Sequence, residues 1–574
     1  MKKKVVIVGG VAGGASAAAR LRRLDEHAEI ILFERGDYIS YANCGLPYYI
    51  GGTIKERSRL MVQTPDAMRS RFAIDVRTNS EVINIDTEKK CVTVRSKEKG
   101  EYVESYDHLI LSPGSKAFVP NIPGVDNERI LTLRNIHDTD KIKHYADRND
   151  VADAIVIGGG FIGVEMAENL RERGLNVTLT EAAPHVLAFL DRDMVALVEK
   201  ELAGNGVELI LNDGVKSFAS IGNRVEATLS SNRKLIADII ILAVGVVPDT
   251  DFLKGSEIKL GVRGHILANE KMETNVKDVY AVGDAVEVVD FVTGSKTAIP
   301  LAGPANKQGR IAADNAAGFD SRYKGSQGTN IIKVFGLTAA GTGANEKALK
   351  AKGIPYKVII IHPSSHASYY PGATPITLKL IFNDEGKILG AQGVGRDGVD
   401  KRIDVISTVI RLKGTVNDLT ELETAYAPPY SSAKDPVNMA GFVAQNVLMG
   451  RSHVITWEEF KGMDKDGYML VDVRTEVEYG KGHIEGAINI PVDSLRSRMN
   501  ELDKDKTIIV YCQVGLRGYF AERILAQHGF KVFNVTGGYR TASALNFNLE
   551  IKSGGDTGRE ASSVSIDPDT QVVK

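Results

Sequence analysis

The chain contains 574 residues, of which 43% are apolar, and at ~150 residues per domain this length is enough for about four packed domains. Its net charge is −2, so it lacks the basic excess that binding to nucleic acid or to an anionic membrane would require. The three cysteines are too few for a disulfide framework and are typical of a reducing compartment. The apolar run near the N-terminus covers only residues 5–8, which is too short for a signal peptide or a membrane span. We therefore expect a soluble, cytoplasmic, multidomain protein.

The first candidate site follows residues 5–8, whose β-branched, apolar character predicts a buried parallel strand. A glycine-rich turn comes next, then an alanine-rich helix that reaches Leu24, then a second strand that ends on an acid. In this order, glycines let the backbone approach a pyrophosphate, the helix N-terminus stabilises its charge, and the acid holds a ribose hydroxyl. Val11 stands where a middle glycine is usual, and a merely structural turn is the alternative. We assign to this dinucleotide site Gly9, Gly10, Gly13, Gly14, Glu34 and Arg35.

A second copy of the pattern begins at Ala154 and carries the complete fingerprint in Gly158, Gly160 and Gly163, with Glu181 ending the next strand. Two fingerprints about 150 residues apart indicate two nucleotides, one in each domain. A carboxylate at the ribose accepts from a 2′-hydroxyl and repels a 2′-phosphate, so the sequence favours NADH. Arg171 or Arg173 nearby leaves NADPH open as the alternative.

Three shorter segments lie between and after these copies. Residues 109–115 and 240–250 are each an apolar strand that runs into a glycine or proline turn, which suits a chain crossing between two domains. Residues 274–286 place Asp284 after a strand and a glycine, where a carboxylate can hold flavin ribitol hydroxyls; an ordinary strand-ending turn is the alternative. We add to the cofactor sites Gly114, Gly245, Gly283 and Asp284.

This succession of two nucleotide folds, two crossings and a third segment with an aspartate resembles the flavoprotein disulfide reductases with two dinucleotide-binding domains. The resemblance covers about residues 1–450. It implies FAD on the first fold and NAD(P)H on the second. It also implies an FAD-binding domain at 1–115 and 246–325, an NAD(P)H-binding domain at 116–245 and a dimerisation domain at 326–450.

Residues 40–52, SYANCGLPYYIGG, contain one thiol, Cys44, and no second cysteine within a few residues, which excludes a thioredoxin-type pair. A lone thiol beside a dinucleotide site predicts a redox nucleophile whose disulfide partner is a small molecule, and an inert cysteine is the alternative. Single-cysteine members of the family are NADH oxidases, NADH peroxidases and coenzyme A disulfide reductases. The first two carry a histidine in the first glycine turn, where this chain has Ala12. Both motifs therefore resemble the coenzyme A disulfide reductases most.

The resemblance also implies how coenzyme A is held, because its phosphates need cations near the cysteine. Arg20 and Arg23 share a helix face at i, i+3 and match phosphate-contacting positions of the family, although a solvated basic face is the alternative. We assign to the substrate site Ser16, Arg20, Arg23, Ser40, Asn43, Arg71, Asn306 and Lys434.

From about residue 328 the sequence changes to alternating strands that resemble the family's dimerisation domain. In the family, a tyrosine at the Tyr426 position and another near Tyr370 reach across a homodimer to the partner's cysteine. A phenol can protonate a departing thiolate, and packing at the interface is the alternative role.

Residues 455–552 resemble a rhodanese sulfurtransferase domain. Cys512 directly follows a strand, Arg517 comes five residues later, and a helix begins there, so backbone N–H groups and a guanidinium are expected to face the sulfur. Related phosphatases have a loop one residue longer, which is sized for phosphate, so the shorter loop here favours a sulfane sulfur. An inactive rhodanese fold is the alternative. Residues 553–574 are polar and are expected to be disordered.

The fold class predicted for the whole chain is α/β, with two Rossmann-like domains, an α+β dimerisation domain and an α/β rhodanese domain. We expect a homodimeric enzyme that uses NAD(P)H and FAD to reduce coenzyme A disulfide, coenzyme A persulfide or polysulfide at Cys44, while Cys512 carries sulfane sulfur. An NADH oxidase or peroxidase and a flavin redox sensor or sulfur carrier are the alternatives. No metal site is expected.

Overall fold

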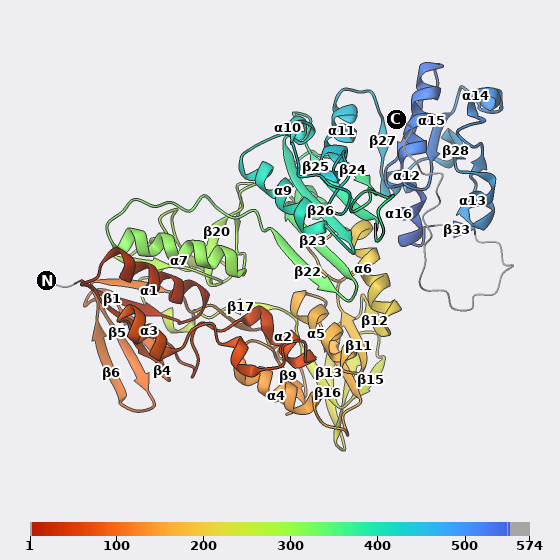
Figure 1. Cartoon of the computed structure of the whole chain (residues 1–574). Helices are drawn as coiled ribbons and strands as arrows, with labels where there is room; N and C mark the ends of the chain where they lie inside the picture. Colours follow the sequence, from red (N-terminus) through yellow and green to blue (C-terminus); the bar gives the residue numbers. More distant parts are fainter. Residues whose placement is uncertain (1–2, 548, 551–574) are drawn as a thin grey trace. The chain divides into compact units, whose positions relative to one another are not determined.

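The computed structural model describes residues 3–547 and 549–550 of the chain. It divides into two compact units that meet in the sequence between Arg451 and Ser452, and each is described by itself (Figure 1). The tail predicted to be disordered, residues 553–574, lies outside the described residues. Within the described part, no helix combines the length and the apolar character that a membrane crossing requires.

The first parallel sheet has the strand order β19-β7-β1-β2-β3, with Val5 opposite Ile30 and Leu111 opposite Ala281. Its strands are β1 (Lys4–Val8), β2 (Glu29–Phe33), β3 (Asp75–Arg77), β7 (His108–Leu111) and β19 (Val279–Ala281). Three helices pack on or beside it: α1 (Ala12–Leu24), α3 (Pro65–Phe72) and α7 (Ala302–Ala316). Figure 1 shows α1 and α7 side by side, and a Cβ on Gly309 of α7 would lie 2.3 Å from the carbonyl oxygen of Gly13. The sheet thus joins strands from two distant parts of the sequence.

The second parallel sheet has the order β12-β11-β10-β16-β9 and repeats the strand–glycine turn–helix arrangement. Its strands are β9 (Ile130–Leu131), β10 (Asp153–Ile157), β11 (Asn176–Glu181), β12 (Val207–Leu211) and β16 (Ile239–Leu242). Its helices are α4 (Ile136–Ala146), α5 (Phe161–Glu172) and α6 (Arg192–Gly204). The neighbouring strands β10 and β16 are apolar and almost wholly buried, as is typical of parallel strands covered by helices.

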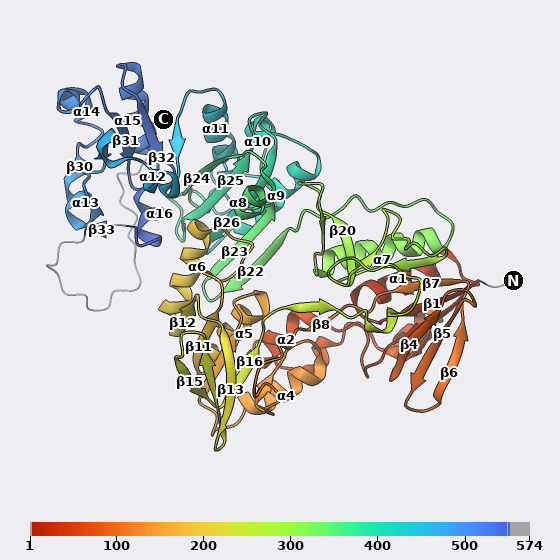
Figure 2. The same cartoon turned by 180° about the vertical axis from the view of Figure 1, so that it is seen from behind.

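The two predicted chain crossings pair with each other. β8 (Ser115–Ala117) and β17 (Val246–Pro248) form an antiparallel ribbon in which Lys116 lies opposite Val247. Figure 2 shows this ribbon between the two parallel sheets. Three smaller sheets complete these regions. Two are antiparallel: β4 (Ser80–Asp86) with β5 (Cys91–Ser96) and β6 (Gly100–Ser105), and β13 (Val215–Ile221) with β14 (Arg224–Leu229) and β15 (Lys234–Ala237). In the third, β20 (Val286–Val289) pairs in parallel with β18 (Ile266–Leu267) and antiparallel with β21 (Lys296–Thr297).

The five-stranded antiparallel sheet of the first unit, called the antiparallel sheet below, has the order β22-β23-β26-β25-β24. Its strands are β22 (Asn330–Val334), β23 (Leu337–Gly343), β24 (Lys357–Ile361), β25 (Ile376–Phe382) and β26 (Ile388–Gly395). The helices of this region are α8 (Glu346–Lys352), α9 (Val399–Arg411), α10 (Val416–Glu421) and α11 (Pro436–Leu448). β25 and β26 are buried along their whole length.

The second unit is built on a parallel sheet of order β27-β32-β31-β28-β30. Its strands are β27 (Val454–Ile455), β28 (Tyr468–Asp472), β30 (Ile488–Asn489), β31 (Thr507–Tyr511) and β32 (Val532–Val535), while β29 (His483–Ile484) pairs with β33 (Leu549–Glu550). Its helices are α12 (Trp457–Lys461), α13 (Glu476–Lys481), α14 (Leu495–Arg498), α15 (Leu516–Gln527) and α16 (Gly538–Ala544). The predicted α/β class, with two Rossmann-like sheets, an antiparallel region and a further α/β unit, is confirmed.

Candidate functional sites

The first glycine turn allows a very close backbone approach. Gly9 has a φ of +94°, and a Cβ there would lie 2.0 Å from the carbonyl oxygen of Ser112. A Cβ on Gly14 would lie 1.9 Å from the carbonyl oxygen of Gly9. Helix α1 begins directly after this turn without a side-chain cap and without an acid in its first turn. Its N–H groups and the positive end of its dipole are therefore open to a phosphate, which fits the pyrophosphate of FAD.

The second glycine turn repeats this geometry. Gly158 has a φ of +107°, a Cβ on Gly163 would lie 1.8 Å from the Gly158 carbonyl oxygen, and a Cβ on Gly160 would meet no atom within 4 Å. Helix α5 also lacks a side-chain cap and a first-turn acid. The turn therefore fits a second pyrophosphate, with open space at the middle glycine.

The two acids at the strand ends lie in matching positions. The Glu34 carboxylate accepts from the backbone N–H of Gly10 and of Gly36, each at 2.9 Å. Glu181 accepts in the same way from Gly159 at 2.6 Å and from Ala183 at 2.7 Å. These bonds hold each carboxylate beside its glycine turn, where a ribose hydroxyl is expected. By contrast, Arg35, which the sequence assigns to the first dinucleotide site, forms an ion pair with Asp249 at 2.6 Å.

Asp284 belongs to a network that the motifs do not reveal. Its Oδ2 atom accepts from the Ser115 hydroxyl at 2.9 Å and from Nη2 of Arg134 at 2.6 Å. Arg134 also donates to the Ser115 carbonyl at 2.8 Å. Gly114, Gly245 and Gly283 adopt positive φ angles of 71°, 118° and 85°. Arg134 was missed because it lies in no motif and 150 residues from Asp284.

Cys44 is exposed and lies in a 3₁₀ turn, Asn43–Gly45, that leads into α2 (Leu46–Gly51). Helix α2 packs closely on α5, because a Cβ on Gly51 would lie 2.1 Å from Oδ1 of Asn169. The protein around the thiol raises the pKa of Cys44, and the Glu165 carboxylate on α5 raises it further. The Oδ1 atom of Asn43, a predicted substrate contact, is buried without a hydrogen-bond partner. The cysteine thus stands where the two nucleotide domains meet.

Glu165 and Tyr48 form a second feature of this junction that sequence reasoning missed. Burial and the neighbouring Glu168 carboxylate raise the pKa of Glu165 to about 7, while a hydrogen bond from Tyr48 lowers it. Burial and Glu165 together raise the pKa of Tyr48 to about 12. The Glu165 carboxylate of α5 thus acts on both the Cys44 thiol and the Tyr48 phenol.

Four of the eight predicted substrate residues lie on α1 and α7. The Ser16 hydroxyl donates to Oδ1 of Asn306 at 2.7 Å, which brings two of them together. The Arg20 guanidinium forms an ion pair with Asp314 of α7 at 2.7 Å, whereas Arg23 is exposed. Ser40 donates its backbone N–H to the Gly10 carbonyl at 2.8 Å, and Arg71 and Lys434 are exposed. Their roles stay predictions.

The tyrosine that contacts Tyr426 is Tyr369, because the two hydroxyl oxygens lie 2.9 Å apart. The predicted Tyr370 instead packs edge-on against His366, with ring centroids 5.8 Å apart. Tyr369 and Tyr426 are both exposed, and a cavity of about 440 Å³ lies beside Tyr426. In the sequence, only the position of Tyr369 directly before the predicted Tyr370 pointed to the Tyr369–Tyr426 pair.

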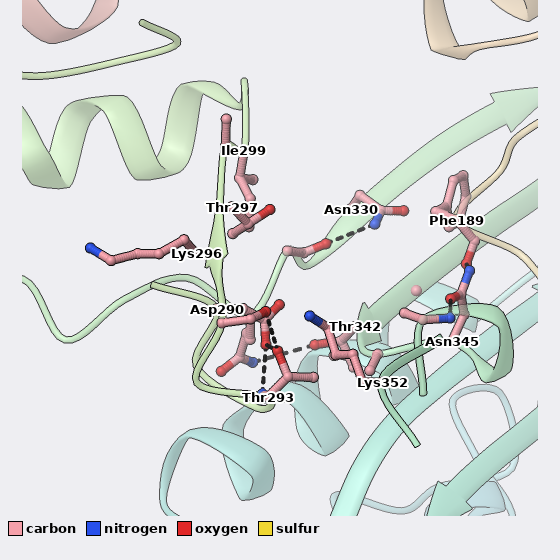
Figure 3. Close-up of a pocket in the computed structure, with 18 of the residues that line it drawn as sticks. Phe189, Asp290, Thr293, Lys296, Thr297, Ile299, Asn330, Thr342, Asn345 and Lys352 are labelled. Atoms are coloured by element: carbon pink, nitrogen blue, oxygen red, sulfur yellow. Dashed lines mark hydrogen bonds between the residues drawn. The ribbon is translucent and has the colours of Figure 1, made fainter. Parts of the chain in front are cut away.

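A larger cavity, of about 530 Å³, lies between the β20–β21 region and the antiparallel sheet. Figure 3 shows its two walls, with Asp290, Lys296 and Thr297 on one side and Phe189 and Asn330 on the other. Phe189 also stacks on Phe161, the first residue of α5, with centroids 5.1 Å apart and planes 3° apart. The cavity therefore ends close to the second glycine turn.

In the second unit, Cys512 is buried at the end of β31, and its Sγ atom accepts from the Gly515 N–H at 3.1 Å. A segment that comes later in the chain holds the cysteine loop, since the N–H of Tyr539 donates to the Cys512 carbonyl at 2.7 Å. Gly538 has a φ of +55°, and a Cβ there would lie 2.4 Å from the same carbonyl oxygen. The close approach of the cysteine loop thus requires a glycine at position 538.

The Arg517 guanidinium forms two hydrogen bonds to Glu478, at 2.7 and 2.6 Å. Burial alone would raise the pKa of Glu478, but the bonds from Arg517 bring it down to about 2. The partner of this guanidinium is thus a carboxylate on α13, and its action on the Cys512 sulfur stays a prediction.

Comparison with known proteins agrees with this division of the chain. The pyridine nucleotide-disulphide oxidoreductase family matches residues 3–309, the dimerisation domain of that family matches residues 329–436, and a rhodanese-like domain matches residues 456–544. The coenzyme A disulfide reductase of Staphylococcus aureus (strain bovine RF122 / ET3-1) is 40% identical over 445 residues, which are 77% of this chain and 100% of that protein.

Two solved structures are similar over both units. The reduced CoADR-RHD of Bacillus anthracis is 52% identical with a TM-score of 0.93, covering 96% of this chain and 99% of that one. The NAD-dependent persulfide reductase from A. fulgidus is 37% identical with a TM-score of 0.88, covering 94% of this chain and 99% of that one.

Proposed function

The chain belongs to the pyridine nucleotide-disulphide oxidoreductase family and carries a rhodanese-like domain, and from this premise we propose that it reduces coenzyme A disulfide or coenzyme A persulfide with NADH. The observation that carries the proposal is the exposed Cys44 on its short turn, packed through α2 against the nucleotide helix α5. Ala12 stands where the oxidases and peroxidases carry a histidine, and it favours this reaction over an NADH oxidase or peroxidase.

The FAD site that we propose joins residues 1–115 with 246–325, because β19 completes the first parallel sheet beside β7. The open N-terminus of α1 would hold the pyrophosphate, Glu34 the ribose, and Asp284 the ribitol chain. NAD(P)H would bind residues 116–245 at α5. Glu181 favours NADH, because its fixed carboxylate repels a 2′-phosphate. When bound, FAD would carry two electrons from NAD(P)H to the sulfur site.

Cys44 would act as the nucleophile. Its thiolate attacks one sulfur of coenzyme A disulfide, a Cys44–coenzyme A disulfide forms, and one coenzyme A thiolate leaves. Over the cycle, coenzyme A disulfide, NADH and one proton give two coenzyme A thiols and NAD⁺. With coenzyme A persulfide the products are coenzyme A, hydrogen sulfide and NAD⁺. The terminal sulfane sulfur would be supplied or accepted by Cys512.

The substrate site that we propose spans the α1–α7 face and a homodimer interface. Ser16, Arg23 and Asn306 would contact coenzyme A on one chain, with Arg23 offering an exposed cation for a phosphate. Residues 326–450 would form the dimer and bring Tyr426 and Lys434 of one chain to Cys44 of the other. The phenol hydrogen-bonded to Tyr369 would protonate the departing thiolate.

The test is NADH oxidation by the FAD-loaded dimer with coenzyme A disulfide, coenzyme A persulfide, polysulfide, peroxide and oxygen as alternative acceptors. We expect many turnovers with the coenzyme A compounds and slow consumption with peroxide and oxygen. Faster oxidation with peroxide or oxygen would replace the proposal by an oxidase or peroxidase. A single equivalent of NADH consumed with every acceptor would indicate a redox sensor.

A further inference from the structure

Four charged side chains outside these sites meet where α6 approaches the antiparallel sheet. Lys379 of β25 is fully buried, and its amine lies 2.8 Å from Asp193, 3.1 Å from Asp191 and 2.5 Å from Glu346. Asp191 and Asp193 stand at the start of α6 in the second nucleotide domain, whereas Glu346 begins α8 beside the antiparallel sheet. The Lys379 cluster, as we call these four residues, therefore joins two domains of the first unit.

The Lys379 cluster is held in one arrangement by hydrogen bonds from both domains. Asp191 donates its N–H to Oε1 of Gln392 at 2.8 Å, and Nε2 of Gln392 donates back to its carboxylate at 2.7 Å. The N–H of Glu346 donates to the same carboxylate at 3.1 Å. The Tyr356 hydroxyl donates to Glu346 at 2.7 Å. A rotation of one domain against the other would break several of these bonds at once.

The composition of the cluster argues against a metal site and against a purely stabilising role. The ammonium of Lys379 occupies the point on which the three carboxylates converge, so a cation is already present. Burial raises the pKa of Asp193, because it disfavours the charged carboxylate. Buried ion networks are poor stabilisers compared with apolar side chains, and their best-attested use is to specify one arrangement.

The cluster is also coupled to the nucleotide helix. Phe189 precedes Asp191 by two residues and stacks on Phe161, the first residue of α5, at 5.1 Å. Asn345, next to Glu346, donates to the Ala188 carbonyl at 3.0 Å. Phe189 lines the cavity of about 530 Å³, and its ring lies close to β23, since a Cβ on Gly341 would be 3.1 Å from its Cδ2 atom (Figure 3). The position of Phe189, and through it the start of α5, thus depends on the cluster.

We propose that the Lys379 cluster is a positioning element that fixes the second nucleotide domain, so that NAD(P)H bound at α5 meets the flavin in one orientation. The inference rests on the proposed function, since it concerns the placement of the same nucleotide. Its members lie outside the proposed nucleotide and flavin sites, and they act through Phe189 and Phe161.

The test is the variant Asp193→Asn/Glu346→Gln/Lys379→Met, which removes the three charges together and leaves Asp191 with its Gln392 and backbone donors. Lys379→Met alone is unsuitable, because it leaves three buried carboxylates without a cation. We expect the triple variant to keep its FAD, its melting temperature within a few degrees and its NADH dissociation constant within about threefold. Flavin reduction by NADH should slow by about tenfold to 100-fold, because a small misplacement suffices for such a loss.

Two further readouts separate positioning from damage to the fold. The long-wavelength absorbance that reports nicotinamide stacked on flavin should weaken in the triple variant at saturating NADH. Without NADH, amide hydrogen exchange in the triple variant should be faster than in wild type at the start of α5 and of α6. It should stay unchanged in the first parallel sheet. The matched control is Arg396→Met, because Arg396 pairs with Glu201 of α6 at 3.4 Å across the same boundary but at the surface. It should change none of these quantities.

A triple variant that reduces its flavin at the wild-type rate, with an unchanged absorbance band, overturns the inference. A slower rate accompanied by loss of FAD or of NADH binding overturns it too, because the cluster would then be merely structural. If the triple variant does not fold, Asp193→Asn alone should slow flavin reduction at least threefold at unchanged NADH affinity, and a wild-type rate contradicts us. Wild-type protein whose flavin neither NADH nor NADPH reduces would instead refute the proposed function itself.

Discussion

The two cysteines to which we assign chemistry stand in opposite surroundings. Cys44 is exposed in a 3₁₀ turn, and the protein around its sulfur together with Glu165 raises its pKa by more than Arg134 lowers it. Cys512 is buried at a strand end, where the Gly515 N–H points at its sulfur. An open thiol can form a disulfide with a substrate as large as coenzyme A, whereas an enclosed sulfur suits the transfer of a single atom. The contrast assigns reduction to the first site and sulfur transfer to the second.

The strongest test of this contrast is Cys44→Ser. We expect the variant to bind FAD and to lose NADH-dependent reduction of coenzyme A disulfide by about 10³-fold or more, because serine cannot form the mixed disulfide. Steady-state NADH oxidation measures the effect. Thiosulfate-to-cyanide transfer should continue at the wild-type rate, and Cys91→Ser is the matched control. Near-normal turnover of coenzyme A disulfide by Cys44→Ser would remove Cys44 as the nucleophile.

The converse test is Cys512→Ser. Thiosulfate-to-cyanide transfer should fall to background, because the loop loses the atom that carries the sulfane sulfur. Reduction of coenzyme A disulfide, which contains no sulfane sulfur, should stay within about twofold of wild type. If coenzyme A disulfide reduction stops in a folded, FAD-loaded Cys512→Ser protein, the two sites form one obligatory relay and the contrast fails.

The tyrosine pair sharpens the description of the first site. Tyr426→Phe should lower turnover of coenzyme A disulfide by about tenfold to 100-fold, since a phenol that protonates the leaving thiolate is lost. Tyr369→Phe should have a smaller effect, because it removes only the hydrogen bond to Tyr426. Tyr370→Phe is the control, and turnover equal to wild type is expected. A loss with Tyr370→Phe that exceeds the loss with Tyr369→Phe would support the role that the sequence predicts for Tyr370.

Nucleotide choice gives a smaller effect that bears on the reductase site alone. Glu181→Ala should shift the ratio of kcat/KM for NADH to that for NADPH by about tenfold toward NADPH, because a charge that repels the 2′-phosphate is removed. Some loss with NADH is also expected, since the N–H groups of Gly159 and Ala183 lose their acceptor. An unchanged ratio would mean that Glu181 does not face the ribose, whereas sulfur transfer at Cys512 should be untouched in either case.

The pH dependence of the Cys44 thiol gives the smallest effect. Because Glu165 raises the pKa of Cys44, Glu165→Gln should lower it and speed alkylation by iodoacetamide in the flavin-free protein above pH 7. The pKa of Glu165 is about 7, so below that pH the wild-type side chain is itself protonated and the two proteins should converge. Equal rates at pH 9 would show that Glu165 does not act on the thiol.

Much of this arrangement could be predicted because its signals are local. The turns after β1 and β10 need glycines at fixed spacings, and the acids Glu34 and Glu181 follow at the end of the next strand. The motif around Cys512 is equally short, so a strand, a turn and a helix suffice to find it. In each case the physical constraint acts over fewer than about 30 residues, which is the length of one βαβ unit.

The partners of these residues could not be predicted, since they come from distant segments. Arg134 meets Asp284, and Arg517 meets Glu478, only after the chain has folded. Lys379 is the clearest example. A lysine amid the apolar residues of β25 would be expected to face solvent, yet the strand is buried on both faces and three carboxylates from elsewhere receive the amine. Local pattern contains no information on such a pairing.

The central claim is that Cys44 alone exchanges sulfur with coenzyme A. It is tested most directly by mass spectrometry of the FAD-loaded protein after it reacts with one equivalent of coenzyme A disulfide. We expect one coenzyme A attached at Cys44 and one coenzyme A thiol in solution. Addition of one equivalent of NADH should then remove the adduct. An adduct on Cys512, or Cys44 oxidised without coenzyme A attached, would contradict the account.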